Sequence, residues 1–375
     1  MKIPYRSALD TTPEYIPGKS IDEVIGQYGA RDVIKLASNE NALGPPQSSI
    51  AAAAKVLKTM GRYPDPYSSK LKSQLAQHDG LPENNILISH GLEEMIPALC
   101  RAYINPGDIS IQPELTFIKY EIGVKIMEGV CIKVPMKNFE IDMDGLLNAV
   151  TEDTKIVWLC NPNNPTGTYI GEKQLVDFLS KIPENVLVVH DETYREFTTA
   201  PDYPRKTVEL LKNYQNLILM RSFSKAYGLA GFRCGYMLAD AEIVRQVMKV
   251  REIFSVSEIA AAAASAALED TLYLEQVLDV IHQGKDYLMK QLRTLPGRYI
   301  TVKDTQANFI YIETSYANTY IFEEMQKKGV IIRPIGSHGL RVTIGLYQEN
   351  IRFIESFKSV LKDCEHIYHK SGATA

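Results

Sequence analysis

The sequence predicts an α/β protein, with a three-layer α/β/α large domain around a mostly parallel seven-stranded sheet and a smaller α+β domain. Two observations predict this class. Up to about residue 255, short apolar, β-branched runs alternate with stretches of helical periodicity. After that point the helical stretches lengthen and strand-like runs become rare. Nearly continuous apolar runs are typical of strands buried on both faces of a parallel sheet.

Seven such runs predict the strands of the large domain, and clear helical stretches lie between them. The predicted strands are 86–89, 109–112, 130–134, 155–160, 186–190, 217–221 and 234–238, and the helices include 92–104, 117–127 and 172–180. This alternation of strands and helices favours a sheet between two helical layers.

The last third of the chain predicts the smaller domain. A long helical region over 258–293 contains one glycine and no proline. Strand-like runs follow at 307–312 and 340–344, with one helix between them at 318–328 and another after them at 348–362.

We therefore expect three parts along the chain. The first is an extended arm, punctuated by proline and glycine, that joins the small domain or a partner subunit. The large domain and the small C-terminal domain follow. The expected boundaries are 1–32, 33–255 and 256–375.

Composition is typical of a soluble, folded protein. Of the 375 residues, 45% are hydrophobic and 23% are charged, close to the average for globular chains. Lysine and arginine total 41 against 45 for aspartate and glutamate, giving a formal net charge of −4. This balance disfavours a nucleic-acid-binding protein and a protein that binds membranes through a polybasic patch.

Cysteine usage and the absence of targeting segments indicate a cytoplasmic protein. The five cysteines are scattered, odd in number and without a C-x-x-C pair, so neither a disulfide framework nor a zinc site is expected. No apolar segment typical of a signal peptide is visible at the start. The longest apolar stretch, 259–268, is about half of what a membrane span needs. No metal, membrane or nucleic-acid partner is expected.

The segment around Lys225 follows a predicted strand and allows three interpretations. It can be a surface turn with a solvated lysine. It also fits the S-x-x-K of serine β-lactamases, but the S-D-N and K-T-G elements of that family do not occur here. In the third interpretation Lys225 forms a Schiff base with pyridoxal phosphate. Ser222, Ser224 and Arg233 would then bind the phosphate through charge-assisted hydrogen bonds.

The third interpretation requires a carboxylate for the pyridine nitrogen of the cofactor, to keep the ring protonated as an electron sink. Asp191 ends an apolar run, where α/β sheets place ligands. Alternatively it is only a turn or helix cap. Three residues later, Tyr194 is placed to bring its hydroxyl near the phenolic oxygen of the cofactor.

Two further segments also follow predicted strands. The loop 161–167 is either a Pro/Asn/Gly turn or the source of an amide, from Asn164, that donates to the phenolic oxygen. Its X-Pro bonds are candidates for the cis form. At 89–94, Gly91 precedes a predicted helix, so this is either an ordinary β-α turn or an anion site made by backbone amides.

Together these segments resemble the fold-type I pyridoxal-phosphate aminotransferases, and within them the histidinol-phosphate aminotransferase family. The matching stretches span nearly the whole chain. They are Tyr15-Ile16-Pro17-Gly18-Lys19, Ala37-Ser38-Asn39-Glu40-Asn41, Arg62-Tyr63-Pro64-Asp65, the loop 164–167, Asp191-Glu192-x-Tyr194, Ser222-x-Ser224-Lys225, Ala230-Gly231-Phe232-Arg233-Cys234-Gly235, Arg333-Pro334 and Leu340-Arg341-Val342-Thr343-Ile344-Gly345.

The resemblance implies a role for each matching residue. It makes Lys225 the Schiff-base lysine and proton shuttle, and Asp191 the partner of the ring nitrogen. It places Asn164 and Tyr194 at the phenolic oxygen of the cofactor and stacks Phe117 on its ring. The residues that it places at the phosphate are Gly91, Leu92, Ser222, Ser224 and Arg233. It also implies a homodimer with shared active sites, in which Tyr63 of one chain contacts the phosphate bound to the other. For the substrate it implies Arg341, with Arg333 as helper and Tyr15 beside them.

The implied reaction transfers an amino group between L-histidinol phosphate and 2-oxoglutarate. Ala42, Leu92 and Phe117 depart from the usual family pattern, so the substrate is less constrained than the reaction. An aromatic-amino-acid aminotransferase and a lyase similar to threonine-phosphate decarboxylase stay open as alternatives. A regulatory module is disfavoured because the arm is too short for a DNA-binding domain. A nicotinamide dehydrogenase is disfavoured because no G-x-G-x-x-G opens a helix.

Overall fold

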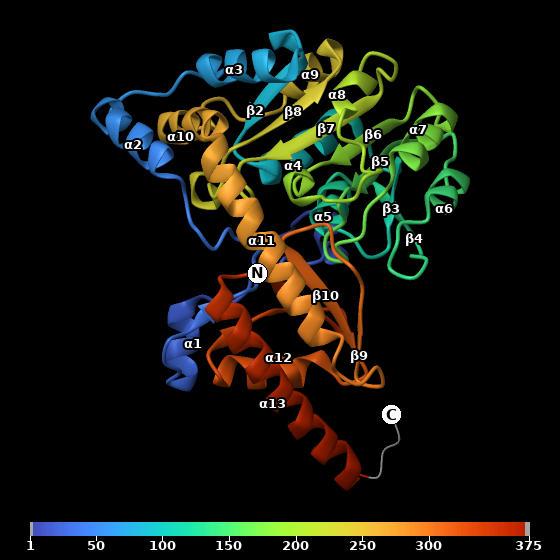
Figure 1. Ribbon diagram of the computed structural model, residues 1–375. Helices are drawn as coiled ribbons and strands as arrows, with labels where there is room; N and C mark the ends of the chain where they lie inside the picture. The colour runs from blue at the N-terminus through green and yellow to red at the C-terminus, as the bar shows by residue number, and fades with distance from the viewer. Residues whose placement is uncertain (1–2, 372–375) are drawn as a thin grey trace.

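The computed structural model describes residues 3–371, which form a large part built on a wide sheet and a smaller part below it (Figure 1). The strands of the wide sheet are β2 (Ile86–Ser89), β3 (Ile109–Pro113), β4 (Val130–Val134), β5 (Thr154–Cys160), β6 (Leu187–Asp191), β7 (Leu217–Ser222) and β8 (Gly235–Ala239). They pair in the order β2-β8-β7-β6-β5-β3-β4. Strand β8 is antiparallel to both neighbours and the other pairs are parallel. The predicted seven-stranded, mostly parallel sheet is confirmed.

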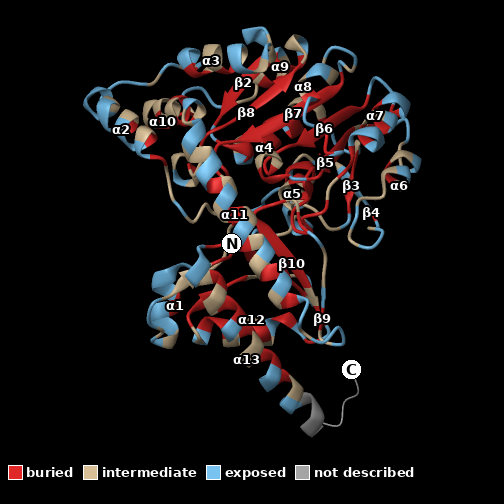
Figure 2. Ribbon diagram, in the orientation of Figure 1, coloured by how far each residue is buried: buried red, intermediate tan, exposed pale blue. Residues whose placement is uncertain are grey.

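Helices cover both faces of this sheet, and its strands are buried between them except for the edge strand β4 (Figure 2). One face packs against α2 (Gln47–Val56), α3 (Ser69–Asp79), α6 (Met143–Asn148), α7 (Glu172–Lys181), the short α8 (Thr207–Leu210) and α10 (Glu258–Glu269). The other face packs against α4 (Leu92–Tyr103), α5 (Lys119–Ile126) and α9 (Ala241–Met248). The predicted three layers are confirmed.

Strand β6 illustrates why these runs form central strands. Val188 packs into the core on one face of the sheet, and the next residue, Val189, packs into the core on the other face. Successive side chains of a strand point to opposite faces. A strand covered on both sides therefore has to be apolar at every position, and the sequence of this strand meets that condition up to its polar carboxyl end.

The smaller part is an antiparallel sheet packed against long helices. Its strands, in the order β12-β13-β10-β9, are β9 (Ile300–Val302), β10 (Phe309–Thr314), β12 (Arg333–Ile335) and β13 (Gly339–Thr343). Its helices are α11 (Thr271–Leu292), α12 (Asn318–Lys327) and α13 (Tyr347–Ser371). The two strand-like runs and the two later helices correspond to β10, β13, α12 and α13. The short strands β9 and β12 were not predicted, because three residues carry too little pattern.

The predicted helical region 258–293 is in fact two helices that meet at Asp270. Asp270 leaves helical geometry, with φ −90° and ψ 69°, and its side chain accepts a hydrogen bond from the backbone N–H of Tyr273 to cap α11. The alanines of α10 pack closely with α2 and belong to the core of the large sheet. The expected boundary at residue 256 assigns α10 to the small domain, whereas the packing changes from one core to the other near Asp270.

The N-terminal arm is less extended than the sequence predicts. Short 3-10 helices occur at Ser7–Asp10 and elsewhere in the chain at Leu57–Thr59, Glu83–Asn85, Arg195–Phe197 and Ala230–Phe232. Helix α1 (Ile21–Tyr28) begins with a capping box in which Ser20 and Glu23 bond each other's backbone N–H groups. Strand β1 (Ile34–Lys35) then pairs in parallel with β11 (Val330–Ile331), so the residues that directly follow the arm are attached to the smaller part.

No helix in residues 3–371 is long and apolar enough to cross a membrane. In the same part of the chain, no group of three or more histidine, cysteine, aspartate or glutamate side chains is arranged to hold a metal ion.

Candidate active site

A cavity of about 260 Å³ lies where the carboxyl ends of β5, β6 and β7 face the smaller part of the molecule. It brings together most of the predicted site residues. Those that line it are Tyr15, Leu92, Phe117, Asn164, Asp191, Tyr194, Ser222, Ser224, Lys225, Arg233 and Arg341. Because parallel strands end at the same edge of a sheet, residues that follow different strands in the sequence meet here.

Lys225 lies in the turn that follows β7. Its Nζ donates a hydrogen bond to the backbone oxygen of Ser38, at 2.9 Å. The pKa of Lys225 is lowered to about 8, mainly by removal from water and then by the positive charge of Arg341. Arg233 also lowers this pKa, whereas Glu40 and Glu93 oppose the shift. A lysine in this setting is unprotonated far more often than a solvated lysine, which favours a nucleophile over a surface charge.

Asp191 is the last residue of β6 and is buried. Its Oδ1 accepts hydrogen bonds from the backbone N–H of Thr193 at 3.0 Å and from the Thr193 hydroxyl at 2.6 Å. Its Oδ2 accepts from the hydroxyl of Tyr120 at 2.6 Å. Burial raises the pKa of Asp191, and these hydrogen bonds oppose that rise by favouring the ionised form. The carboxylate is therefore held in one orientation at the bottom of the cavity.

Asn164 and Tyr194 lie on the side of the cavity that faces the small domain. Arg341 donates to Asn164 Oδ1 at 2.6 Å and to the backbone oxygen of Ala37 at 2.7 Å. This contact leaves the NH₂ end of the Asn164 amide as the end that can donate. The Tyr194 hydroxyl accepts from Asn39 Nδ2 at 3.0 Å. Both X-Pro bonds of the loop, after Asn161 and Asn164, are cis.

The predicted phosphate-binding residues form a cup at the start of α4. Gly91 has φ 75°, and a side chain there would place its Cβ 2.8 Å from Arg233 Nη2. The glycine therefore allows the guanidinium to approach the amino end of the helix. Arg233 donates from Nη1 to the backbone oxygen of Ala230 at 3.0 Å. Ser222 and Ser224 lie side by side, because the Ser224 N–H donates to Ser222 Oγ at 3.1 Å.

Arg333 and Arg341 face each other across β12 and β13. Residues opposite each other in antiparallel strands point to the same side of the sheet, so both cations reach the same region. Arg333 borders an adjoining cavity of about 280 Å³ that also contacts Tyr15, Phe117, Asn164 and Arg341. Arg333 Cζ lies 5.4 Å from the centre of the Tyr15 ring, and Lys119 Nζ lies 4.5 Å from it. Tyr15 thus connects the arm to both parts of the molecule.

Tyr63 does not border the cavity of its own chain, and Arg333 borders only the adjoining one. The Tyr63 side chain is 83% exposed and its ring stacks on Phe254, with 4.8 Å between ring centres. Gly91 does not line the cavity directly either, although it contacts Arg233, which does.

Comparison with known proteins agrees with this geometry. The family model described as "Aminotransferase class I and II" matches residues 31–355. The chain belongs to this aminotransferase family. A histidinol-phosphate aminotransferase of Moorella thermoacetica is 41% identical over 360 residues, which are 95% of this chain and 92% of the relative. One from Geobacillus sp. is 38% identical and covers 96% of this chain and 98% of the relative. The resemblance inferred from the motifs is confirmed, and the protein is an aminotransferase.

Solved structures show the same fold. Histidinol-phosphate aminotransferase from Sinorhizobium meliloti, in complex with pyridoxal-5′-phosphate, superposes with a TM-score of 0.86 and is 26% identical over 96% of this chain and 98% of that one. An L-threonine-O-3-phosphate decarboxylase from Porphyromonas gingivalis superposes with a TM-score of 0.77 at 21% identity, over 88% of this chain and 100% of that one. At that identity the likeness concerns the fold alone.

Sequence reasoning missed several residues of the aminotransferase cavity. Ser38 and Glu40 border it, Asn39 orients Tyr194, and Thr193 and Tyr120 hold Asp191. The first three belong to the motif 37–41, which was matched without a role. Tyr120 had only a weak signal, an aromatic residue one helical turn after Phe117.

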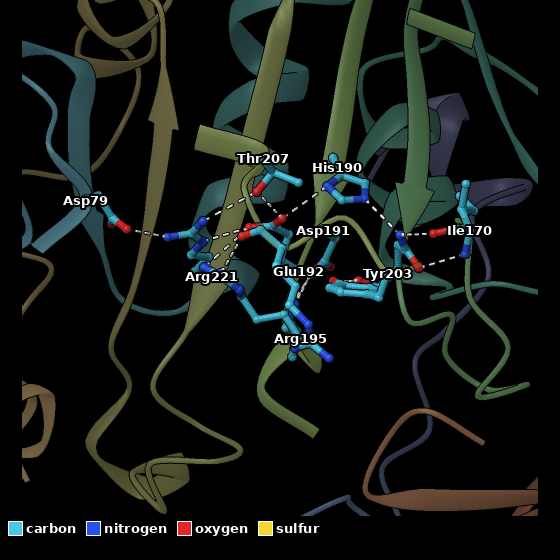
Figure 3. Close-up of polar contacts among 12 residues, drawn as sticks. Asp79, Ile170, His190, Asp191, Glu192, Arg195, Tyr203, Thr207 and Arg221 are labelled. Carbon is cyan, nitrogen blue, oxygen red and sulfur yellow. Dashed lines mark hydrogen bonds and ion pairs between the residues drawn. The ribbon is translucent and has the colours of Figure 1, made fainter. Parts of the chain in front are cut away.

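A buried polar network around Glu192 and Arg221 lies next to the site (Figure 3). These two residues neighbour Asp191 and Ser222 in the sequence, so the alternation of side chains directs them to the opposite face of the sheet. Glu192 accepts from Arg221 Nε at 2.7 Å and from the hydroxyl of Thr207 at 2.6 Å. Arg221 also donates to Asp79 at 2.7 Å. Burial alone would raise the pKa of Glu192, but the nearby guanidinium groups outweigh it and hold this pKa well below its usual range.

His190 belongs to the same network. Its ring is fully buried, with Nε2 3.2 Å from Asn161 Nδ2 and Nδ1 3.4 Å from Glu192 Oε1. It is therefore a core residue on the far side of the strand, as the alternation of side chains predicts. His338, three residues before Arg341, has Nδ1 3.2 Å from the backbone oxygen of Tyr316 and does not border the cavity.

Proposed function

We propose that this aminotransferase exchanges an amino group between L-histidinol phosphate and 2-oxoglutarate, giving imidazole acetol phosphate and glutamate, in histidine biosynthesis. The observation that carries the proposal is the placement of Arg333 and Arg341 together beside the cavity of Lys225. One substrate presents a phosphate and the other a carboxylate. Two guanidinium groups that converge on one region can bind either oxyanion through paired hydrogen bonds.

The residues present fit pyridoxal 5′-phosphate as the cofactor. Gly91 leaves the space that lets Arg233 and the start of α4 surround a phosphate group, and a Cβ there would close it. Asp191 is a buried acid whose oxygens are already oriented by hydrogen-bond donors. In the proposal Ser222, Ser224, Arg233 and the backbone around Leu92 hold the phosphate. Asn164 and Tyr194 contact the phenolic oxygen, Asp191 pairs with the ring nitrogen, and Phe117 covers the ring.

Bound pyridoxal phosphate supplies an electron sink for the negative charge that develops when a substrate carbon loses its proton. Lys225 Nζ binds the cofactor and holds the proton that leaves this carbon, because its lowered pKa allows it to accept and return a proton near neutral pH. Asp191 keeps the opposite end of the site negative. Arg341, already held by Asn164 and Ala37, presents a guanidinium of fixed orientation to the substrate anion.

The proposal includes a homodimer whose sites are shared between two chains. Tyr63 would reach the cofactor phosphate of the partner subunit. In support, Tyr63 lies among exposed apolar side chains, with Met60, Tyr67, Ile253 and Phe254 also exposed. These side chains come from residues 60–67 and 251–254. The two segments are in contact, since Tyr63 stacks on Phe254 and Arg251 donates to the backbone oxygen of Pro66. An apolar surface of this kind is typical of a protein contact. A cytoplasmic location fits the composition and the scattered cysteines.

A panel of amino donors tests the substrate. Purified holoenzyme is given 2-oxoglutarate with histidinol phosphate, phenylalanine, tyrosine or O-phosphothreonine, and glutamate and carbon dioxide are measured. We expect glutamate from histidinol phosphate with a kcat/KM at least about tenfold above that for the aromatic amino acids. Turnover of an aromatic amino acid without histidinol phosphate would overturn the substrate assignment. Release of carbon dioxide from O-phosphothreonine without glutamate would make the protein a lyase.

A further inference from the structure

Tyr120 is a buried residue of α5 whose hydroxyl donates to Asp191 Oδ2 at 2.6 Å. The other carboxylate oxygen, Oδ1, is occupied by Thr193. We propose that Tyr120 is a positioning residue, which fixes the Asp191 carboxylate in the orientation and ionisation state that the ring nitrogen of the cofactor requires. This inference rests on the role proposed above for Asp191.

The Tyr120 ring is held so that its hydroxyl cannot turn away from Asp191. It stacks on Trp158 with 4.7 Å between ring centres and 8° between ring planes. Trp158 is fixed in turn, because its indole N–H donates to Ser110 Oγ at 2.8 Å. All three side chains are buried. A donor whose own position is set by packing costs little reorganisation when the reaction begins.

Tyr120 also contacts the residue proposed to cover the cofactor ring. Its ring meets Phe117 edge to face, with 5.6 Å between centres and 87° between planes. One side chain therefore supports two proposed contacts of the cofactor, the carboxylate below the ring nitrogen and the aromatic ring on its face. These two contacts come from different elements, β6 and the segment before α5, and Tyr120 connects them.

The hydrogen bond has a specific chemical consequence. A buried carboxylate is more basic than a solvated one, and every donor to its charged form makes it less basic. With both oxygens engaged, Asp191 competes less for the proton that it shares with the ring nitrogen. If Tyr120 donated nothing, this proton would move toward the carboxylate, and the electron-withdrawing power of the ring would fall.

The variant Tyr120→Phe separates this role from packing, because it keeps the stacked ring and removes only the hydroxyl. We expect kcat to fall roughly ten- to hundredfold while KM for both substrates changes less than about threefold, the range for losing a hydrogen bond to a charged group. We also expect the cofactor to bind about tenfold more weakly in equilibrium dialysis. In enzyme loaded with cofactor labelled with ¹⁵N in the ring, the nitrogen resonance should move from the pyridinium toward the neutral position.

Tyr203→Phe is the matched control. Tyr203 is also buried, but its hydroxyl donates to the backbone oxygen of Asn161 at 2.9 Å and not to the Asp191 carboxylate. The Tyr203→Phe variant should lose about as much free energy of unfolding in urea as Tyr120→Phe. It should keep the ¹⁵N resonance and the cofactor affinity of the wild type. If Tyr120→Phe and Tyr203→Phe behave alike in these measurements, Tyr120 is only a packing residue and the inference is wrong.

Asp191→Asn separates this failure from a failure of the proposed site. If Asp191→Asn loses activity and the pyridinium signal while Tyr120→Phe keeps both, the role of Asp191 stands and the inference about Tyr120 falls. If Asp191→Asn keeps both, the proposed role of Asp191 is itself overturned, and the inference falls with it.

Discussion

At the scale of single residues, the central feature is a lysine whose surroundings make it reactive. Lys225 follows β7, donates only to the backbone oxygen of Ser38 among the described residues, and lies near two arginines. Burial and like charge both destabilise its protonated form. Neither effect is visible in a tetrapeptide motif, since both depend on which distant residues pack around it.

Replacement of Lys225 tests the covalent role. Lys225→Ala should abolish transamination and remove the near-visible absorbance of the bound cofactor, because no other amine replaces Nζ. Borohydride reduction of the wild type, followed by peptide mass mapping, should locate the cofactor on Lys225. The exposed Lys212→Ala serves as the control and should behave as the wild type. A Lys225→Ala enzyme that keeps most of its activity would refute the assignment.

The pKa of Lys225 predicts how loading of the apoenzyme depends on pH. The amine reacts with the cofactor aldehyde only when it is unprotonated. The rate of cofactor binding should therefore rise with pH up to about 8, the lowered pKa, and level off above it. Stopped-flow absorbance measured from pH 6 to 10.5 checks this; an inflection near the ordinary lysine pKa would show that Nζ is solvated in the apoenzyme.

At the scale of elements, two adjacent strands carry the chemistry on one face and its support on the other. Asp191 and Ser222 end β6 and β7 and border the cavity. Glu192 and Arg221, each next to one of them in the sequence, form an ion pair on the opposite face (Figure 3). The alternation of side chains makes this arrangement possible, and the ion pair joins the ends of the two strands.

Removal of one partner of this pair should destabilise the whole protein. Glu192→Gln leaves Arg221 buried without its full counter-charge, which costs about 3–5 kcal/mol in the free energy of unfolding. Urea denaturation of the apoenzyme measures the loss. Glu242→Gln is the control, because Glu242 pairs with Arg245 at the surface and should be close to neutral. If the two substitutions lower the free energy of unfolding equally, the buried ion pair contributes no more to stability than the surface pair.

At the scale of the whole molecule, distant parts of the chain form the cavity, and one proposed site residue lies outside it. The cavity combines residues of the arm, the wide sheet and β13. Tyr63 lies outside it and is exposed. In the proposed dimer this residue completes the site of the partner subunit, which makes activity a property of the pair.

Mixing of two inactive variants tests the shared site. Lys225→Ala and Tyr63→Ala should each be strongly impaired alone. Unfolded and refolded together in equal amounts, they should regain roughly a quarter of the wild-type activity, because about half of the dimers are mixed and each mixed dimer has one intact site. Analytical ultracentrifugation should show that each preparation is dimeric. No recovery in a mixture that is dimeric would mean that Tyr63 serves its own chain.

The sequence by itself determined the strands of the wide sheet and the order of the motif residues. Apolar runs, glycines and prolines report local structure, and residues that follow parallel strands must meet at one edge of the sheet. The sequence also held the capping box of α1, a local signal that was overlooked in an arm rich in proline. Local chemistry therefore predicted Lys225, Asp191 and the phosphate cup as candidates.

Only the tertiary structure decided which distant residues complete the site. Tyr120 bonds Asp191 across 71 positions, and Arg341 bonds Asn164 across 177. Helix α10 packs with α2 in the large core, although the pattern of its sequence continues into α11. The physical reason is the same in each case. Strand order and packing set the distances between remote segments, and burial and neighbouring charge set the pKa of Lys225, so none of these can be read from local periodicity.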